Sequence, residues 1–176
     1  MTLLELAAQE GVTGFLHPAE AERLQELATD NDVLEVGSFQ GLSAWIMARV
    51  ARTITCVDTF KANTAGQDQQ ADFTTLDAFR KATDQFPNVT TFIGTSEQAA
   101  VDIHGDFDMI FIDAMHTYED VKADIARWWP RVRAGGVFVG HDYRHNDFKG
   151  VEQAFDEVFG PAPEGTTVVT LRWIQK

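Results

Sequence analysis

Hydrophobic residues follow helical spacing in the first 30 positions of the chain and then change pattern. Leucines and alanines predict a short helix that ends at Gly11, and a second helix that begins at Pro18, a residue suited to the first helical position. From Asp32 onward, short apolar runs alternate with amphipathic segments. We therefore expect residues 1–31 to form an N-terminal helical extension and residues 32–176 to form one α/β domain.

Five apolar runs predict the strands of this domain, and each is followed directly by Gly or Asp. The runs are Val33–Val36, Thr53–Val57, Val89–Ile93, Met109–Ile112 and Gly136–Val139. Amphipathic segments between them predict helices, one of them capped by Thr117 with Asp120 completing a capping box. Residues 166–175 fit either one long strand or a tight pair. Such alternation indicates a mostly parallel sheet covered by helices on both faces.

The residues that follow the predicted strands carry most of the candidate chemistry. In a parallel sheet of this kind, ligands bind outside the carboxyl ends of the strands. The residues expected to line that edge are Gly37, Asp58, Gly94, Asp113, His141 and Asp142. We therefore place the functional site there.

The turn after the first strand is rich in glycine, with Gly37 and Gly41 four residues apart. Glycines let the backbone turn sharply and approach a ligand, and the helix that follows offers free N–H groups. The dinucleotide fingerprint G-x-G-x-x-G is absent because no third glycine is in register. Asp58 lies 21 residues beyond Gly37, where an acid can accept both ribose hydroxyls. The glycines alone also fit an ordinary strand–helix turn, and Asp58 favours a nucleoside site.

A second group of candidate residues follows the fourth and fifth predicted strands. Asp113 ends an all-apolar strand, where a lone charge is costly unless it has a partner. His141 and Asp142 follow the next strand, so three groups able to bind a metal come within reach of one point. Oxygen-rich sites of this kind suit Mg²⁺ or Mn²⁺.

These motifs resemble those of a known enzyme family. The segment Glu35-x-Gly37-x-x-x-Gly41-x-Ser43 resembles the first motif of class I S-adenosylmethionine-dependent methyltransferases, closest to the small metal-dependent O-methyltransferases of the catechol and macrolide-sugar type. Residues 107–118 are similar to their fourth-strand motif, and the resemblance covers residues 15–175. It implies a Rossmann-like, mostly parallel twisted sheet with helices on both faces and an antiparallel C-terminal strand.

The resemblance also implies roles for individual residues in binding S-adenosylmethionine. Ser43 would bind the carboxylate of its methionine part, Glu35 its amino group and Asp58 the ribose diol. Ser96 would contact the adenine. The full set implied as binding this cosubstrate is Glu35, Gly37, Ser38, Phe39, Gly41, Ser43, Asp58, Thr59, Ser96 and Asp113.

The chain departs from the family at one implied metal ligand. In the family the metal is held by an acid, here Asp113, and by an acid–acid or acid–amide pair on the fifth strand. Here His141 takes the first place of that pair and Asp142 the second. Histidine is a poor ligand for Mg²⁺ but a fair one for Mn²⁺, Fe²⁺ or Zn²⁺. A different metal, weak binding, a site of the two acids alone, and a metal-free site all stay open.

His116, three residues past Asp113, corresponds to a candidate general base in the resembling enzymes. An imidazole is well suited to take a hydroxyl proton near neutral pH. Asp113 and His116 are therefore the expected catalytic residues, and a helix-capping or substrate-positioning role for His116 is the alternative. Tyr143 and His145 follow the metal pair and are candidates for substrate contact.

The charge of the chain narrows the classes of partner. Its 14 basic and 27 acidic residues give a net charge of −13, which argues against nucleic acid and anionic membranes as partners. Seven acids against Arg23 give residues 1–32 a local charge of −6, which we interpret as a solvated surface. One cysteine, Cys56, excludes an internal disulfide, and no secretory signal is evident, so we expect a cytoplasmic protein.

Together these features predict an S-adenosylmethionine-dependent, divalent-metal-assisted O-methyltransferase that acts on a small hydroxylated molecule. Polar residues in the loop 60–74 suit a sugar-containing acceptor. The alternatives are a non-catalytic nucleoside-binding module, a metal-independent methyltransferase and a nicotinamide oxidoreductase, the last disfavoured by the missing glycine. A homo-oligomer is left open because the Trp128-Trp129 pair and Trp173 fit either an interface or a core.

Overall fold

The computed structural model describes residues 1–61 and 73–176. Its strands are β1 (Asp32–Val36), β2 (Thr53–Asp58), β3 (Val89–Ile93), β4 (Phe107–Ile112), β5 (Val132–Gly140), β6 (Thr167–Val168) and β7 (Leu171–Gln175). Its helices are α1 (Leu3–Gln9), α2 (Pro18–Ala28), α3 (Leu42–Ala48), α4 (Phe73–Thr83), α5 (Ser96–Asp102), α6 (Tyr118–Trp128), the short η1 (Trp129–Arg131) and α7 (Lys149–Phe159).

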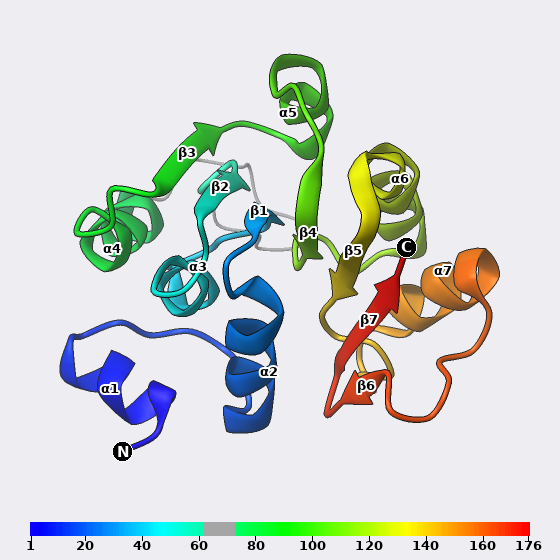
Figure 1. The fold of residues 1–176 in the computed structure, drawn as a ribbon, viewed down its shortest axis with the longest axis horizontal. Coiled ribbons are helices and arrows are strands. Elements are labelled where there is room, and N and C mark those ends of the chain that lie inside the picture. Colours follow the sequence, from blue (N-terminus) through cyan, green and yellow to red (C-terminus); the bar gives the residue numbers. More distant parts are fainter. Residues whose placement is uncertain (62–72) are drawn as a thin grey trace.

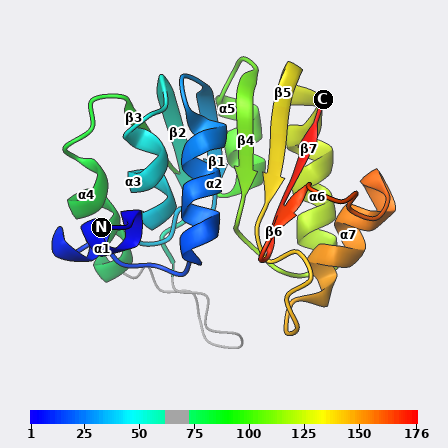
Figure 2. The ribbon, with the colours of Figure 1, turned by 60° about the horizontal axis from the view of Figure 1, so that its bottom comes forward.

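The strands form one seven-stranded sheet in the order β3-β2-β1-β4-β5-β7-β6 (Figure 1). The first five in this order run parallel, while β7 is antiparallel to both β5 and β6. In Figure 2, β4 and β5 point downward and β7 returns toward the C-terminus at the top. The predicted Rossmann-like sheet with an antiparallel C-terminal strand is therefore confirmed, and residues 166–175 form the tight pair.

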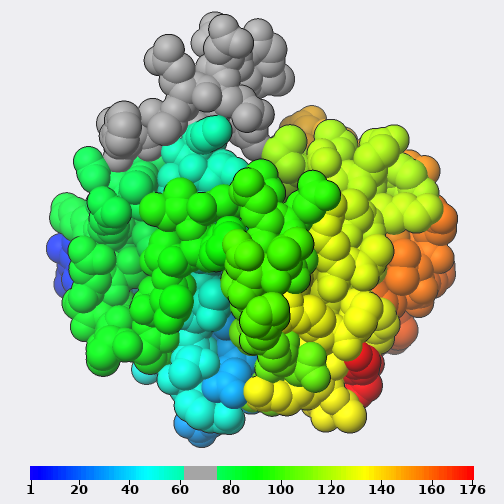
Figure 3. All heavy atoms as spheres, turned by 90° about the horizontal axis from the view of Figure 1, so that it is seen from above, coloured from blue at the N-terminus to red at the C-terminus, as the bar shows by residue number. Residues whose placement is uncertain are grey.

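Helices cover both faces of the sheet, as the apolar strands predicted. On one face, α2, α3 and α4 pack their apolar side chains on β1, β2, β4 and β5 around a core that includes Met47, Phe79 and Phe111. On the other, α5, α6 and α7 pack around Ile110, Trp128 and Phe138. Figure 3 looks onto this second face, with α5 at the centre of the view and α6 beside it. α1 lies outside α2 and α3 in a smaller apolar cluster.

The elements differ from the sequence prediction in two places. α5 was not predicted, because seven residues give too little periodicity, although Thr95 and Gln98 form a capping box that marks its start. β5 begins four residues before the predicted Gly136 and continues the pairing with β4 past an irregularity between Phe107 and Met109.

The N-terminal helices are packed closely against the rest of the chain. Leu24 and Ala28 of α2 are fully buried in the core against the sheet. Trp45 of α3 is also fully buried, and its indole N–H donates to Glu10 at 3.0 Å.

None of the helices in the described residues has the length and apolar character that a membrane crossing requires.

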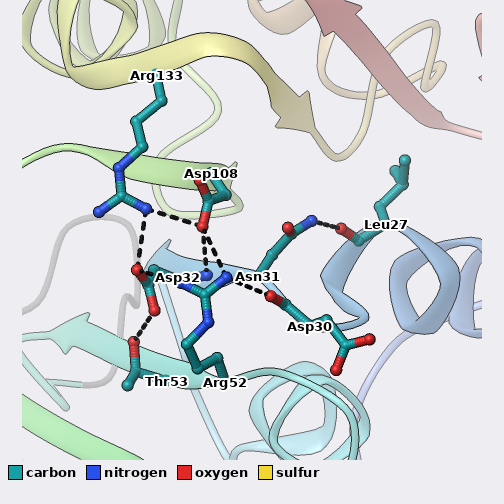
Figure 4. A network of polar contacts seen from close by, with 8 residues as sticks. All are labelled: Leu27, Asp30, Asn31, Asp32, Arg52, Thr53, Asp108 and Arg133. Atoms are coloured by element: carbon teal, nitrogen blue, oxygen red, sulfur yellow. Dashed lines mark hydrogen bonds and ion pairs between the residues drawn. The ribbon is translucent and has the colours of Figure 1, made fainter.

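Charged residues join the strands at the amino edge of the sheet, opposite the predicted site (Figure 4). Asp32 begins β1 and Asp108 is the second residue of β4, and the Arg133 guanidinium contacts them at 2.9 and 2.8 Å. The Asp108 carboxylate also accepts the Asp32 backbone N–H at 2.9 Å, and Arg52 contacts Asp32 at 3.0 Å. Hydrogen bonding from Arg133 lowers the pKa of Asp32. This network ties together the starts of three neighbouring strands.

Candidate functional site

The predicted site edge lies where the sheet topology reverses. β1 and β4 are parallel neighbours, and the helices that follow them, α3 and α6, pack on opposite faces. Such a reversal opens a crevice at the carboxyl ends of the two strands. Asp113 follows β4 directly, and its backbone N–H donates to Val36 of β1 at 2.8 Å. The structure thus brings the glycine turn and the Asp113 segment side by side, as the sequence predicted.

Gly37 allows this close approach. Its φ is +95°, and a Cβ at this position would lie 2.1 Å from the Asp113 carbonyl oxygen. Gly41 also has a left-handed φ, +89°, and is the N-cap of α3, where a Cβ would touch the ring of Phe79 at 3.1 Å. Both glycines are therefore required by backbone conformation and by neighbouring atoms. Ser43, predicted to bind the methionine carboxylate, lies in the first turn of α3 and is buried.

Glu35 is fully buried in β1. The Ser38 hydroxyl donates to its Oε2 at 2.5 Å, while its Oε1 has no hydrogen-bond partner among the described residues. Burial raises the pKa of Glu35 to about 7, against the hydrogen bond from Ser38, which lowers it. A carboxyl group with a free acceptor atom beside the glycine turn can receive a hydrogen bond from an amine.

Asp58 joins the glycine turn to the end of β2. Its Oδ2 accepts the Phe39 N–H at 2.8 Å and its Oδ1 accepts the Phe60 N–H at 2.6 Å. Each carboxylate oxygen keeps a second lone pair, so the group can still accept hydroxyls. Phe39 is exposed, whereas Phe60 is buried against Phe79 in the core. Thr59 follows Asp58, and its hydroxyl accepts the Lys61 N–H at 3.3 Å.

Ser96, predicted to contact the adenine, already has two partners. Its hydroxyl donates to the carboxylate of Asp124 and accepts the Trp128 indole N–H at 2.8 Å. Burial raises the pKa of Asp124, while hydrogen bonds from Ser96 and Arg127 lower it. Ser96 therefore ties α5 to α6, and its contact with adenine stays a prediction. Trp128 is fully buried, so it belongs to the core alternative that the sequence left open.

The three predicted metal ligands converge at the ends of β4 and β5. One ligand atom from each of Asp113, His141 and Asp142 lies within 4.8 Å of the others. The His141 Nδ1 is 3.4 Å from Asp113 Oδ1 and 3.4 Å from Asp142 Oδ2. Asp142 has a left-handed φ of +58°, a conformation in which Asp and Asn are enriched among residues other than glycine. The described residues thus contain a compact group of two carboxylates and one imidazole.

His141 also contacts a residue that the sequence analysis assigned to the surface. Its Nε2 lies 3.2 Å from Oε2 of Glu20, which is 2% exposed in the first turn of α2. Burial lowers the pKa of His141, but Asp113, Asp142 and Glu20 outweigh it and raise that pKa to about 12. Interpreting all acids of residues 1–32 as solvated was therefore wrong for Glu20, because α2 packs this side chain inward.

His116, the predicted base, lies beside the same cluster. Its Nε2 is 2.9 Å from Asp142 Oδ2, and its ring stacks on Phe148 with 4.0 Å between centroids. His145 stacks on Phe148 too, at 4.7 Å. Burial raises the pKa of Asp142, but the two histidines, His116 and His141, hold it well below its usual range. Asp142 is therefore ionised, in hydrogen-bonding distance of His116 and close to His141.

Tyr143, a candidate for substrate contact, is instead buried. It is 1% exposed, and its hydroxyl donates to Asp156 at 2.7 Å. Arg172 lies over its ring at 4.7 Å and contacts the same Asp156. The aromatic ring thus anchors the loop after β5 to α7. Of the polar loop proposed to select the substrate, residues 62–72 lie outside the described part of the chain.

Comparison with known proteins identifies the family. A family model described as a methyltransferase domain matches residues 34–143, more than half of the chain, from the glycine turn to the His141–Asp142 pair. This chain belongs to that methyltransferase family. The predictions of a class I S-adenosylmethionine-dependent methyltransferase and of an enzyme are confirmed. A search of curated proteins finds no match.

Solved structures of methyltransferases share the fold. An O-methyltransferase from Bacillus cereus in complex with SAH matches with a TM-score of 0.65 and 18% identity, covering 99% of this chain and 89% of that one. TomG from Streptomyces achromogenes, in complex with SAM, matches with a TM-score of 0.70, 18% identity and the same coverage. CalS11, a TDP-rhamnose 3'-O-methyltransferase, matches with a TM-score of 0.60 and 16% identity, and the match covers 89% of this chain and 77% of that one.

Proposed function

We propose that this methyltransferase transfers the methyl group of S-adenosylmethionine to a hydroxyl of a small molecule, with a divalent metal at Asp113, His141 and Asp142. The observation that carries the proposal is the convergence of these three side chains, with His116 in contact, beside the glycine turn. A site that only binds a nucleoside does not need a carboxylate–imidazole cluster at the neighbouring strand ends.

The cosubstrate is assigned to the β1 side of the crevice. Gly37 and Gly41 leave the backbone open there, and Asp58 has lone pairs free for the ribose hydroxyls. The unpartnered Oε1 of Glu35 suits the amino group of the methionine part. The other residues predicted to contact the cosubstrate stay part of this proposal: Ser38, Phe39, Ser43, Thr59, Ser96 and Asp113.

The residues at the end of β4 and β5 fit a divalent cation. Two carboxylates and one imidazole suit Mn²⁺, Fe²⁺ or Zn²⁺ better than Mg²⁺, which prefers oxygen ligands alone. A cation bound there would orient the acceptor hydroxyl and lower its pKa. A protonated His141 would have to lose the proton on Nδ1 before it could bind a metal, so the metal affinity is expected to fall at low pH.

His116 is the proposed base for the acceptor proton. Asp142 is ionised and can only accept, so the hydrogen between them belongs to Nε2 of His116. In the neutral ring this leaves the lone pair on Nδ1, free to take the hydroxyl proton. As the O–CH₃ bond forms, the S–CH₃ bond breaks and the proton passes to that nitrogen. The stack on Phe148 holds the ring in this orientation.

The acceptor is proposed to be a small, hydroxyl-rich molecule that contains a sugar. The net charge of −13 disfavours nucleic acid, and the structural neighbour CalS11 acts on TDP-rhamnose according to its name. The single free cysteine, Cys56, suits the cytoplasm as the place of reaction. A metal-independent methyltransferase on the same fold is the second candidate, favoured by the contacts of His141 with Asp113, Asp142 and Glu20, because an imidazolium there can balance these carboxylates without a cation.

The test measures methyl transfer from labelled S-adenosylmethionine to a panel of sugar-containing and catechol acceptors. We expect transfer that EDTA abolishes and Mn²⁺ restores, and a fall of about 10²–10⁴-fold in kcat for His116→Ala. His104→Ala, an exposed histidine, is the matched control. Full activity in EDTA would establish the metal-independent reaction. Binding of S-adenosylhomocysteine without transfer to any acceptor would favour the non-catalytic module.

A further inference from the structure

Glu20 is a buried acid that none of the proposed steps uses. It lies in the first turn of α2, 121 residues before His141 in the chain, and its side chain is 3% exposed. A buried carboxylate is costly unless every lone pair has a partner, so its contacts indicate what it is for.

The Glu20 carboxylate is held by four donors from three segments of the chain. Oε1 accepts the backbone N–H and the hydroxyl of Thr170, both at 2.8 Å, from the turn between β6 and β7. Oε2 accepts the His17 N–H at 2.9 Å, which closes the capping box of α2. The fourth partner is Nε2 of His141, 3.2 Å from Oε2. The two donors of Thr170 and the His17 N–H therefore fix the carboxylate independently of His141.

A carboxylate held in this way determines where the hydrogen of the imidazole sits. An ionised carboxylate can only accept, so Nε2 of His141 has to carry a hydrogen. In a neutral ring the lone pair then lies on Nδ1, which faces Asp113 and Asp142 at 3.4 Å each. These separations exceed the usual hydrogen-bond length of about 2.7–3.2 Å. They approach the spacing of about 3 Å between neighbouring ligands on a cation with bonds near 2.1 Å.

We propose that Glu20 is a positioning residue for His141. It accepts the hydrogen of Nε2 and so leaves the Nδ1 lone pair directed at the metal position between Asp113 and Asp142. The inference rests on the proposed metal-assisted function. Helix α2 would then contribute to the metal site, because its residue Glu20 contacts the His141 ring on the side away from Asp113 and Asp142. Carboxylate groups that orient a ligating histidine in this way change metal affinity by about 10–100-fold when they are removed.

Glu20→Gln is the direct test because it keeps the size of the side chain. Thr170 presents two donors to Oε1, so the amide oxygen is expected there and the amide NH₂ takes the place of Oε2, where the His17 N–H loses its acceptor. That NH₂ would donate to Nε2 of His141 and move the ring hydrogen to Nδ1, facing the two carboxylates. Glu22→Gln, an exposed acid on the same helix, is the matched control.

The measurement is Mn²⁺ binding to the full chain by isothermal titration calorimetry, without cosubstrate or acceptor. We expect Glu20→Gln to weaken Mn²⁺ binding by at least 10-fold and Glu22→Gln to leave it unchanged. In a His141→Ala background, Glu20→Gln should have no further effect, because its influence passes through the ring. Equal Mn²⁺ affinity for Glu20→Gln and the unsubstituted protein would overturn the positioning role and leave the proposed function intact.

Failure of the proposed metal site has a different signature. If the unsubstituted protein binds no Mn²⁺, the metal-assisted function itself is wrong, whatever the variants do. If Glu20→Gln does not fold, as judged by circular dichroism, nitrogen NMR of the unsubstituted protein with Zn²⁺ decides. The proposal expects His141 to keep its hydrogen on Nε2 and to bind the metal through Nδ1, and a hydrogen on Nδ1 in the metal-bound state would contradict it.

Discussion

Gly37→Ala tests how the crevice is built, because two costs of known origin meet at this residue. A residue with a Cβ at φ +95° is strained by about 1–2 kcal/mol. The new Cβ would also lie 2.1 Å from the Asp113 carbonyl oxygen and 2.4 Å from its carbonyl carbon. Both are backbone atoms, so the ends of β1 and β4 would have to separate, and overpacking of this kind costs about 1–3 kcal/mol. We expect a total loss of about 2–5 kcal/mol.

Gly105→Ala separates the two costs. Its φ is +100°, close to that of Gly37, but no heavy atom of the described residues lies within 4 Å of the added Cβ. It should therefore lose only the backbone part, about 1–2 kcal/mol. Urea unfolding of both variants gives the free energies, and the excess loss in Gly37→Ala measures the contact with Asp113.

The same pair of variants reports on cosubstrate binding. Separating β1 from β4 would displace both the glycine turn and Asp113, so Gly37→Ala should weaken S-adenosylhomocysteine binding at least tenfold, measured by calorimetry. Gly105→Ala lies far from the turn in sequence and should bind as the unsubstituted protein does. Equal stability loss in the two variants, with unchanged binding in both, would refute this account of the crevice.

Three further predictions concern charged groups. Burial raises the pKa of Glu35 from 4.5 to about 7, so this carboxyl binds a proton more tightly in the folded state than in the unfolded chain. The free energy of unfolding should therefore fall by about 3 kcal/mol as the pH rises from 4.5 through 7. Glu35→Gln should remove that decline in urea unfolding at a series of pH values, and an equally steep decline in the variant would contradict it. Asp58→Asn should weaken S-adenosylhomocysteine binding about tenfold, because one of the two oxygens with a lone pair left for the ribose hydroxyls becomes an NH₂ donor; unchanged affinity would argue against the ribose assignment. Asp108→Asn should lose about 1 kcal/mol in low salt and less in 1 M salt, since its partner Arg133 is partly exposed; a loss independent of salt would show that the ion pairs are not the cause.

Periodicity in the sequence was sufficient for most of the fold. The five apolar runs became the five parallel strands, because buried strands in such a sheet need apolar side chains on both faces. Pro18 begins α2 and Thr117 caps α6, as local chemistry predicted. Only half of the predicted capping box forms: the Asp120 N–H donates to the Thr117 hydroxyl, but the Asp120 carboxylate accepts that hydroxyl instead of the Thr117 backbone N–H. α5 was missed because a seven-residue helix with one buried residue shows no stripe.

The candidate site was predictable where its residues follow strands. Gly37, Asp58, Asp113 and the His141–Asp142 pair share an edge because parallel strands end on the same side. Strand position alone does not show how side chains use their hydrogen bonds. Tyr143 directly follows Asp142 in the chain, yet it turns into the core toward Asp156.

The sequence by itself determined the fold class, the family and the edge at which the site lies, because these depend on periodicity and on the order of motifs. Only the tertiary structure decided which acids are solvated. Glu20 looks like its neighbours Glu22 and Glu26 in sequence, but the packing of α2 buries it against His141 and Thr170. Contacts between residues 121 and 150 positions apart depend on how helices and strands pack, and no local pattern records that packing.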